Sequence, residues 1–191
     1  TINNPQSTQF VSALLLIGAN VQTDSTSPYI TLTRAMIEQW GKAAEYTSSL
    51  VGGVGGGLHL PALAVDAACS GNPGLMEFRG VIADTGTQVF HRGPYVDGTN
   101  NIGEFLALVL GLAYLKKEKL DWVLYSDSKT AISWVRQKQC KTKLEWSAKN
   151  QDLLLAVRAA EKWLHENTWT TSIYKWDTEH WGEIPADFGR K

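Results

Sequence analysis

The sequence is poor in cysteine, which limits the classes of protein to which the chain can belong. Only Cys69 and Cys140 occur among its 191 residues. This number argues against a small domain held together by disulfides and fits a reducing compartment. Residues 1–9 contain no Lys or Arg ahead of the first apolar stretch, so a secretory signal is not expected. The sequence therefore favours a cytoplasmic protein.

Long apolar runs and a large net charge are also missing. The best candidate for a membrane span, residues 10–19, is interrupted by Ser12 and Gly18 and is shorter than the roughly 18 residues that a spanning segment needs. The 18 basic and 19 acidic residues give a formal net charge of −1. We expect no membrane contact, and any site for nucleic acid must be a local basic patch. The sequence indicates no obligate protein partner.

A glycine-rich stretch at residues 51–57 divides the chain into two zones. It holds too many glycines for a helix or a regular strand, and we interpret it as a flexible linker. We therefore expect an N-terminal extension over residues 1–60, with one helix at residues 31–46, followed by a single domain over residues 61–191. The chain is long enough for one well-buried domain but short for two.

Hydrophobic periodicity predicts an α/β fold for the second zone. Apolar runs and turn signals favour three strands joined by short turns, and helical spacing favours a buried helix next. The expected order is three strands (63–68, 78–83, 88–92), a helix (104–117), a strand (122–125), two helices (128–137, 146–166), a strand (170–176) and a closing helix from Pro185. This pattern predicts a five-stranded mixed sheet flanked by helices.

Four carboxylates stand at conspicuous places in this pattern. Asp66 interrupts an apolar strand and Asp127 ends another, and an ionised side chain is costly to bury there without a partner. Three of the four positions also have an ordinary explanation. Asp127 could cap a helix, and Glu104 and Asp187 could interact with helix dipoles.

Taken together, the four carboxylates could converge at one edge of the sheet. Clustered carboxylates raise one another's pKa, and they ionise jointly near neutral pH only when cations neutralise them. Oxygen ligands with room for water and phosphate suit Mg²⁺ or Mn²⁺. The sequence therefore predicts a divalent metal site.

The residues around these carboxylates resemble the four motif blocks of type-1 ribonuclease H, in the order of that family. The blocks are DAACSGNPG at residues 66–74, TNNIGE at 99–104, YSDS at 125–128 and AD at 186–187. The C-terminal segment WGEIPADFGRK resembles a bacterial subgroup that often carries an N-terminal viroplasmin-like hybrid-binding domain. Residues 1–60 show no match to that domain.

The resemblance implies the ribonuclease H fold and an endonuclease that hydrolyses the RNA strand of RNA·DNA hybrids, leaving 5′-phosphate and 3′-hydroxyl ends. Asp66, Glu104, Asp127 and Asp187 would be catalytic and would hold two Mg²⁺ ions, with Mn²⁺ as a substitute. Contacts with the 2′-hydroxyls of RNA are implied at Cys69, Gly71, Asn72, Asn100, Asn101 and Glu104.

A basic run over residues 129–149 matches the position of the basic protrusion of the family. Lys138, Lys141 and Lys143 lie in it, between Trp134 and Trp146, and could hold the phosphates of the DNA strand. The alternative is a solvated loop and helix face.

The chain departs from the family near the last carboxylate. Many members carry a Gly-His pair ten residues before it, where this chain has Asp177. His180 is displaced from that position, so either residue could take the role of the histidine, and Glu183 could assist the metal site.

Two rival functions remain from the sequence alone. Another nuclease with the same fold could cut DNA junctions or double-stranded RNA, since fold alone does not set the substrate. An inactive hybrid-binding module is the other rival. Four intact carboxylates argue against it, because a binder gains nothing from negative charge that faces phosphate.

Overall fold

Five strands form one mixed sheet in the order β3-β2-β1-β4-β5. The computed structural model describes residues 57–189. Strands β1, β2 and β3 are antiparallel neighbours, whereas β4 and β5 continue the sheet in parallel with β1. The strands are β1 (Ala62–Gly71), β2 (Gly74–Ile82), β3 (Gln88–Gly98), β4 (Val123–Ser126) and β5 (Ile173–Lys175). This architecture confirms the predicted fold class.

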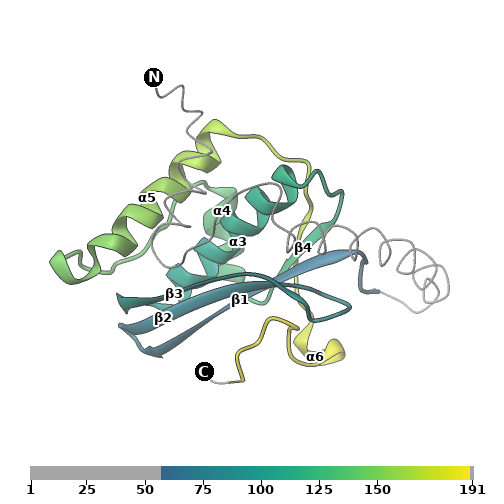
Figure 1. Cartoon of the computed structure of the whole chain (residues 1–191), viewed down its shortest axis with the longest axis horizontal. Helices are drawn as coiled ribbons and strands as arrows, with labels where there is room; N and C mark the ends of the chain where they lie inside the picture. The colour runs from purple at the N-terminus through teal and green to yellow at the C-terminus, as the bar shows by residue number, and fades with distance from the viewer. Residues whose placement is uncertain (1–56, 190–191) are drawn as a thin grey trace, which may run out of the picture.

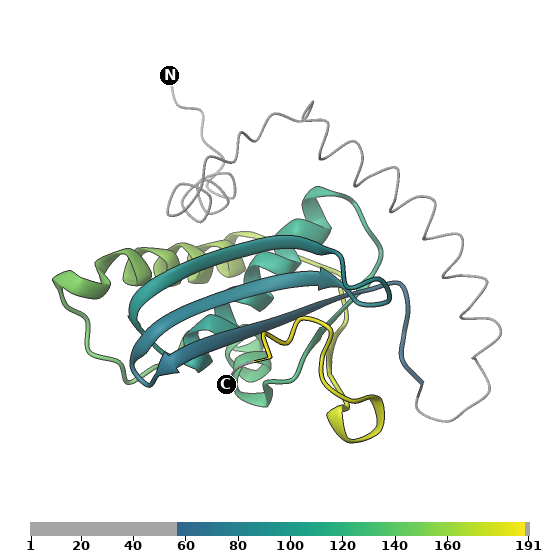
Figure 2. The same ribbon diagram turned by 60° about the horizontal axis from the view of Figure 1, so that its bottom comes forward.

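Four helices accompany the sheet in the described residues. They are α3 (Asn100–Lys117), α4 (Lys129–Arg136), α5 (Gln151–Glu166) and the single-turn α6 (Thr178–Trp181). Figures 1 and 2 show α3, α4 and α5 on one face of the sheet and the C-terminal segment on the other. None of these helices is both long and apolar enough to cross a membrane. The predicted helix at residues 31–46 and residues 51–56 of the predicted linker lie outside the described residues.

The two faces of β1 support two separate cores. Leu63, Val65 and Ala67 are buried in the main core beneath α3. Ala62 and Ala64 point the other way, because side chains alternate along a strand, and they pack in a second core with residues of the C-terminal segment. A strand covered on both faces explains the continuous apolar run that surrounds Asp66.

Helix α3 begins four residues earlier than the sequence indicates. Thr99 is its N-cap, and the Thr99 side chain accepts a hydrogen bond from the Ile102 N–H at 3.3 Å. Asn100 and Asn101 therefore form the first turn of the helix. Glu104 lies in the second turn, where it is 1% exposed.

The predicted start of the long helix at residue 146 is also wrong, because α5 begins at Gln151. Ser147 and Asn150 instead form a capping box around a short 3-10 turn. The Asn150 amide also donates hydrogen bonds to the Glu145 and Asp97 carbonyls. Asn150 therefore ties the preceding loop to the end of β3, and Trp146 lies in that loop.

The predicted closing helix from Pro185 does not form. Pro185 and Ala186 make a turn instead, and the Asp187 N–H donates to the Ile184 carbonyl at 2.9 Å. The Arg79 guanidinium donates hydrogen bonds to the carbonyls of Ala186 and Asp187, at 2.8 and 2.6 Å. These carbonyls accept hydrogen bonds from a side chain, and Ile184 and Ala186 are buried in the second core, so the segment forms a turn and a loop instead of a helix.

Candidate active site

The parallel pairing of β1 and β4 brings Asp66 and Asp127 together. Ala62, Leu63 and Ala64 pair with Val123, Leu124 and Tyr125, each at the same offset along the chain. Two residues further on, this register places Asp66 beside Asp127. Strand β4 ends at Ser126, so the sheet opens at this point and leaves room for another side chain.

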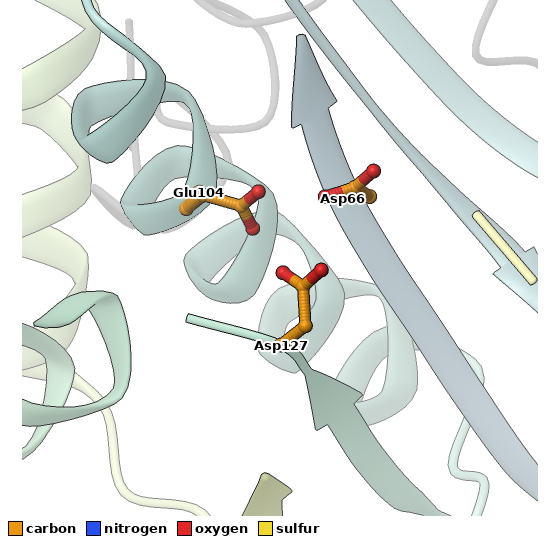
Figure 3. Close-up of side chains that lie close together, drawn as sticks. All are labelled: Asp66, Glu104 and Asp127. Carbon is orange, nitrogen blue, oxygen red and sulfur yellow. The ribbon is translucent and has the colours of Figure 1, made fainter. Parts of the chain in front are cut away.

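Glu104 fills that place from α3. Its Oε1 accepts a hydrogen bond from the Ala67 N–H at 3.1 Å, which holds the side chain against the residue that follows Asp66. One carboxylate oxygen each of Asp66, Glu104 and Asp127 lies within 4.8 Å of the other two. Figure 3 shows the three side chains converging from β1, α3 and the end of β4.

The electrostatics of this group require a positive partner or a proton. Burial raises the pKa of Glu104 well above its ordinary value, and the hydrogen bond and charge of Asp66 and the charge of Asp127 raise it further. Apart from this contact with Asp66, the buried Glu104 Oε2 atom has no hydrogen-bond partner. A buried acceptor of this kind is costly unless it is neutralised or bound. Three clustered carboxylates with an unsatisfied oxygen are the hard donor set that suits a divalent cation such as Mg²⁺ or Mn²⁺.

The raised pKa of Glu104 predicts how stability depends on pH without metal. A carboxyl whose pKa is higher in the folded state stabilises the fold fully only below its unfolded pKa. The free energy of unfolding should therefore fall as pH rises from the ordinary glutamate pKa through the raised pKa of Glu104. Thermal melts in EDTA between about pH 4 and 9 would measure this slope. Glu104→Gln should flatten it, and an unchanged slope in that variant would contradict the assignment.

Asp187 does not belong to the group of carboxylates within 4.8 Å of one another, judged over residues 57–189. Its Oδ2 accepts a hydrogen bond from the Gly189 N–H at 2.9 Å. Its backbone nevertheless lies close to Asp66, because Arg79 pairs directly with Asp66 across β1 and β2 and binds the Asp187 carbonyl. Directly opposed residues share one face of a sheet, so Asp66, Arg79 and the Asp187 backbone lie on the same side.

The family model for RNase H matches residues 61–178. This match covers three of the four carboxylates and every strand of the sheet. The chain belongs to the ribonuclease H family. The matched region begins one residue before β1 and ends in α6.

Solved structures of ribonucleases H are also similar to this chain. RNase H1 from the archaeon Halobacterium salinarum is 23% identical over 59% of this chain and 82% of its own, with a TM-score of 0.38. The N-terminal RNase H domain of a Mycobacterium tuberculosis protein is 23% identical over 61% and 81% of the two chains, with a TM-score of 0.37. LC11-RNase H1, isolated from compost, in complex with an RNA/DNA hybrid is 18% identical over 59% and 82%, with a TM-score of 0.36.

The residues expected to contact RNA lie at two loop-proximal places in this ribonuclease H domain. Cys69 and Gly71 are at the end of β1, and the exposed Asn72 follows in the turn to β2. Asn100 and Asn101 open α3. The Cys69 thiol donates to the Gly98 carbonyl at 3.4 Å, which connects the first place to the end of β3, just ahead of the second. Burial raises the pKa of Cys69, so its sulfur is a neutral thiol rather than a nucleophile.

The structure separates the basic run into two parts. Lys138, Lys141 and Lys143 belong to the loop that follows α4, and Lys141 and Lys143 are exposed. The Lys138 ammonium lies over the ring of Trp169, 5.8 Å from its centroid. The loop is anchored on α5, because the Cys140 N–H donates to Glu161 Oε2 at 3.1 Å. Lys129 and Arg136 instead lie on α4 itself.

Asp177 and His180 form a pair at the start of α6. Asp177 caps this helix, and its Oδ2 lies 2.7 Å from His180 Nδ1. The His180 side chain is 72% exposed. Glu183 is exposed beyond α6. Like Asp187, these three residues lie outside the cluster of Asp66, Glu104 and Asp127, within the described part of the chain.

Two residues position the site although the sequence analysis assigned neither of them a role. Arg79 holds the C-terminal segment beside Asp66, and its signal in the sequence is a lone cation within an apolar strand. Gly103 lies at the contact of α3 with β1, where an added Cβ would come within 2.7 Å of the Ala67 Cβ and the Met76 sulfur. A glycine inside a helix is a signal of close packing, although it does not reveal the neighbour.

Proposed function

We propose that this ribonuclease H is an endonuclease that hydrolyses the RNA strand of RNA·DNA hybrids. The observation that carries the proposal is the convergence of Asp66, Glu104 and Asp127, with their oxygens within 4.8 Å of one another. Clustered carboxylates repel one another unless a cation or a proton neutralises them, and a divalent cation can bind all three. Their place in a domain that matches the RNase H family over residues 61–178 supports phosphodiester hydrolysis.

The proposed cofactor is a pair of divalent cations, Mg²⁺ with Mn²⁺ as a substitute. Asp66, Glu104 and Asp127 would hold them, and we propose Asp187 as a fourth ligand. Two such ions supply activation of the attacking water and stabilisation of the leaving 3′ oxygen, which gives 5′-phosphate and 3′-hydroxyl products. Arg79 keeps the backbone of residues 186 and 187 on the side of the sheet that carries Asp66, which supports the role of Asp187.

The residues of the chain itself would position the hybrid. The two places formed by Cys69 to Asn72 and by Asn100 and Asn101 present small polar groups and backbone beside Glu104. Such groups suit contact with 2′-hydroxyls, which distinguish RNA from DNA. His180, held by Asp177, and Glu183 lie on the segment that leads to Asp187. We propose them as accessory residues near the metal site.

The proposed function is tested with three labelled duplexes of one sequence: RNA·DNA, RNA·RNA and DNA·DNA. We expect cleavage of the RNA strand of the hybrid alone, only when Mg²⁺ or Mn²⁺ is present, with a 3′-hydroxyl on the upstream product. Cleavage of RNA·RNA or of DNA junctions would indicate another nuclease of the same fold. Hybrid binding without cleavage in either metal would indicate an inactive binding module.

The loop lysines should contribute phosphate contacts. Replacing Lys138, Lys141 and Lys143 together with alanine should weaken hybrid binding. With each lost phosphate contact, fewer counterions are released from the hybrid when the protein binds. The slope of log K against log salt should fall by up to about 0.9 for each contact. Fluorescence anisotropy in EDTA at several salt concentrations measures this slope. An unchanged slope would indicate that these lysines lie on a solvated loop and make no phosphate contact.

We propose residues 61–191 as the catalytic domain and residues 1–60 as an extension dispensable for the chemistry. The end of the extension contributes contacts to the domain. The His59 N–H donates to the Tyr125 hydroxyl at 2.8 Å, and the His59 ring stacks on Tyr174. Leu58 and Leu60 pack against the second core. A shortened chain should therefore keep residues 58–60.

A further inference from the structure

A pocket of about 410 Å³ lies between α4 and the edge strand β5. One face of α4 forms most of it, with residues at helical spacing, and β5 contributes its last residue. The lining residues, which we call the basic pocket, are Lys129, Ile132, Ser133, Arg136, Gln137 and Lys175. Three of the six are cations and none is acidic. Ile132 is 5% exposed, so it forms an apolar floor.

One end of the basic pocket borders the carboxylate cluster. Lys129 begins α4 two residues after Asp127. Lys175 pairs with Ser126 across β4 and β5, and Ser126 immediately precedes Asp127. From there the pocket follows α4 away from the cluster. Lys129 and Arg136 are seven residues apart, which is about 10 Å along a helix.

The polar groups of the basic pocket are available to a ligand. Within residues 57–189, Lys129 and Arg136 make no ion pair. The Lys175 ammonium donates to the Trp176 carbonyl at 2.9 Å, which leaves two of its three N–H groups. The Ser133 hydroxyl accepts a hydrogen bond from the Gln137 amide at 2.8 Å, so its own proton remains free to donate. Asp177 follows Lys175 closely, but its carboxylate is held by His180.

We propose that the basic pocket binds phosphates of the substrate beyond the cleavage site, as a second backbone contact separate from the loop lysines. The inference rests on the proposed function. Lys129 and Arg136 lie about 10 Å apart along α4, so they can contact different phosphates of one strand. Arg136 offers a planar fork for phosphate oxygens, and Lys175 a point charge. A substrate that extends past the carboxylate cluster on one side would reach the far end of the pocket, whereas a short hybrid would not.

The test compares hybrids with one cleavable core that is extended on its 5′ side, on its 3′ side or on neither. The variant is Arg136→Gln; Lys129 and Lys175 are left intact because both lie at the end of the pocket that borders Asp127. The control, Arg158→Gln, removes equal charge at an exposed position of α5. Arg136→Lys keeps the charge. Steady-state kinetics in Mg²⁺ and anisotropy in EDTA provide the readouts.

We expect the variant to raise KM about tenfold for one of the two extended hybrids, with kcat unchanged, because uniform binding is lost. Its salt slope for that hybrid should fall by up to about 0.9, for one contact. The unextended core should not change, the control should behave as wild type, and the charge-keeping variant should restore most of the affinity. Equal effects on all three hybrids, no effect on any, or the same effect in the control would overturn the proposal. Failure of the wild-type protein to cut the unextended core would instead contradict the proposed function.

Discussion

Hybrid cleavage should fall by at least about 10³-fold when Asp66 is replaced by asparagine, because a metal ligand contributes several kcal/mol to the transition state. Asp66 is fully buried on β1, and asparagine has nearly the same shape, so the fold should persist. The same change removes a charge that raises the pKa of Glu104. We therefore expect a higher melting temperature in EDTA together with lost activity.

The loss of activity together with a higher melting temperature in EDTA distinguishes a metal ligand from a carboxylate that only stabilises the fold. Asp127→Asn should reproduce both of them, since Asp127 shares the cluster. Asp121→Asn is the matched control, because Asp121 is exposed just before β4 and belongs to no cluster in the described residues. Asp66→Asn should also weaken the stabilisation that Mg²⁺ gives in thermal melts. Near wild-type turnover in Asp66→Asn or Asp127→Asn would refute the proposed site.

The sequence predicts the sheet well because its strands and its main helix carry strong periodic signals. Asp66 and Asp127 could be recognised because an ionisable side chain within an apolar strand is costly. The predicted C-terminal helix fails for a cause that lies far away in the sequence. Arg79 donates hydrogen bonds to the carbonyls of residues 186 and 187, and these bonds prevent a helix there. No pattern within the C-terminal segment reveals this cation, because Arg79 lies on β2.

The basic residues show a second limit of sequence reasoning. A run of lysines and arginines over residues 129–149 resembles one surface, yet Lys129 and Arg136 line a pocket with Lys175, whereas Lys141 and Lys143 lie exposed on the next loop. Linear order cannot separate these groups, because the division depends on which face of α4 meets β5. Lys175 joins the pocket through the pairing of β5 with β4.

The placement of Glu104 depends on a residue without a side chain. Gly103 allows α3 to approach β1 so closely that an added Cβ would come within 2.7 Å of the Ala67 Cβ, which is fixed to the backbone. Gly103→Ala must therefore push α3 away from β1 or twist it. A displacement near 1 Å can cost about 10²-fold in rate. Glu104 is the next residue, and its hydrogen bond to the Ala67 N–H spans the same contact.

Gly111 provides a matched comparison on the same helix. An added Cβ there would meet mainly the terminal methyls of Leu124, at 2.9 and 3.3 Å, and these can rotate aside. Each Gly→Ala change gains about 1 kcal/mol in helix propensity, while overpacking costs about 1 to 3 kcal/mol. Neither variant should unfold, so activity is the decisive measurement. We expect Gly103→Ala to lower kcat for the hybrid about 10²-fold and Gly111→Ala to leave kcat within about twofold. If both variants retain wild-type kcat, the close approach of α3 to β1 does not set the position of Glu104.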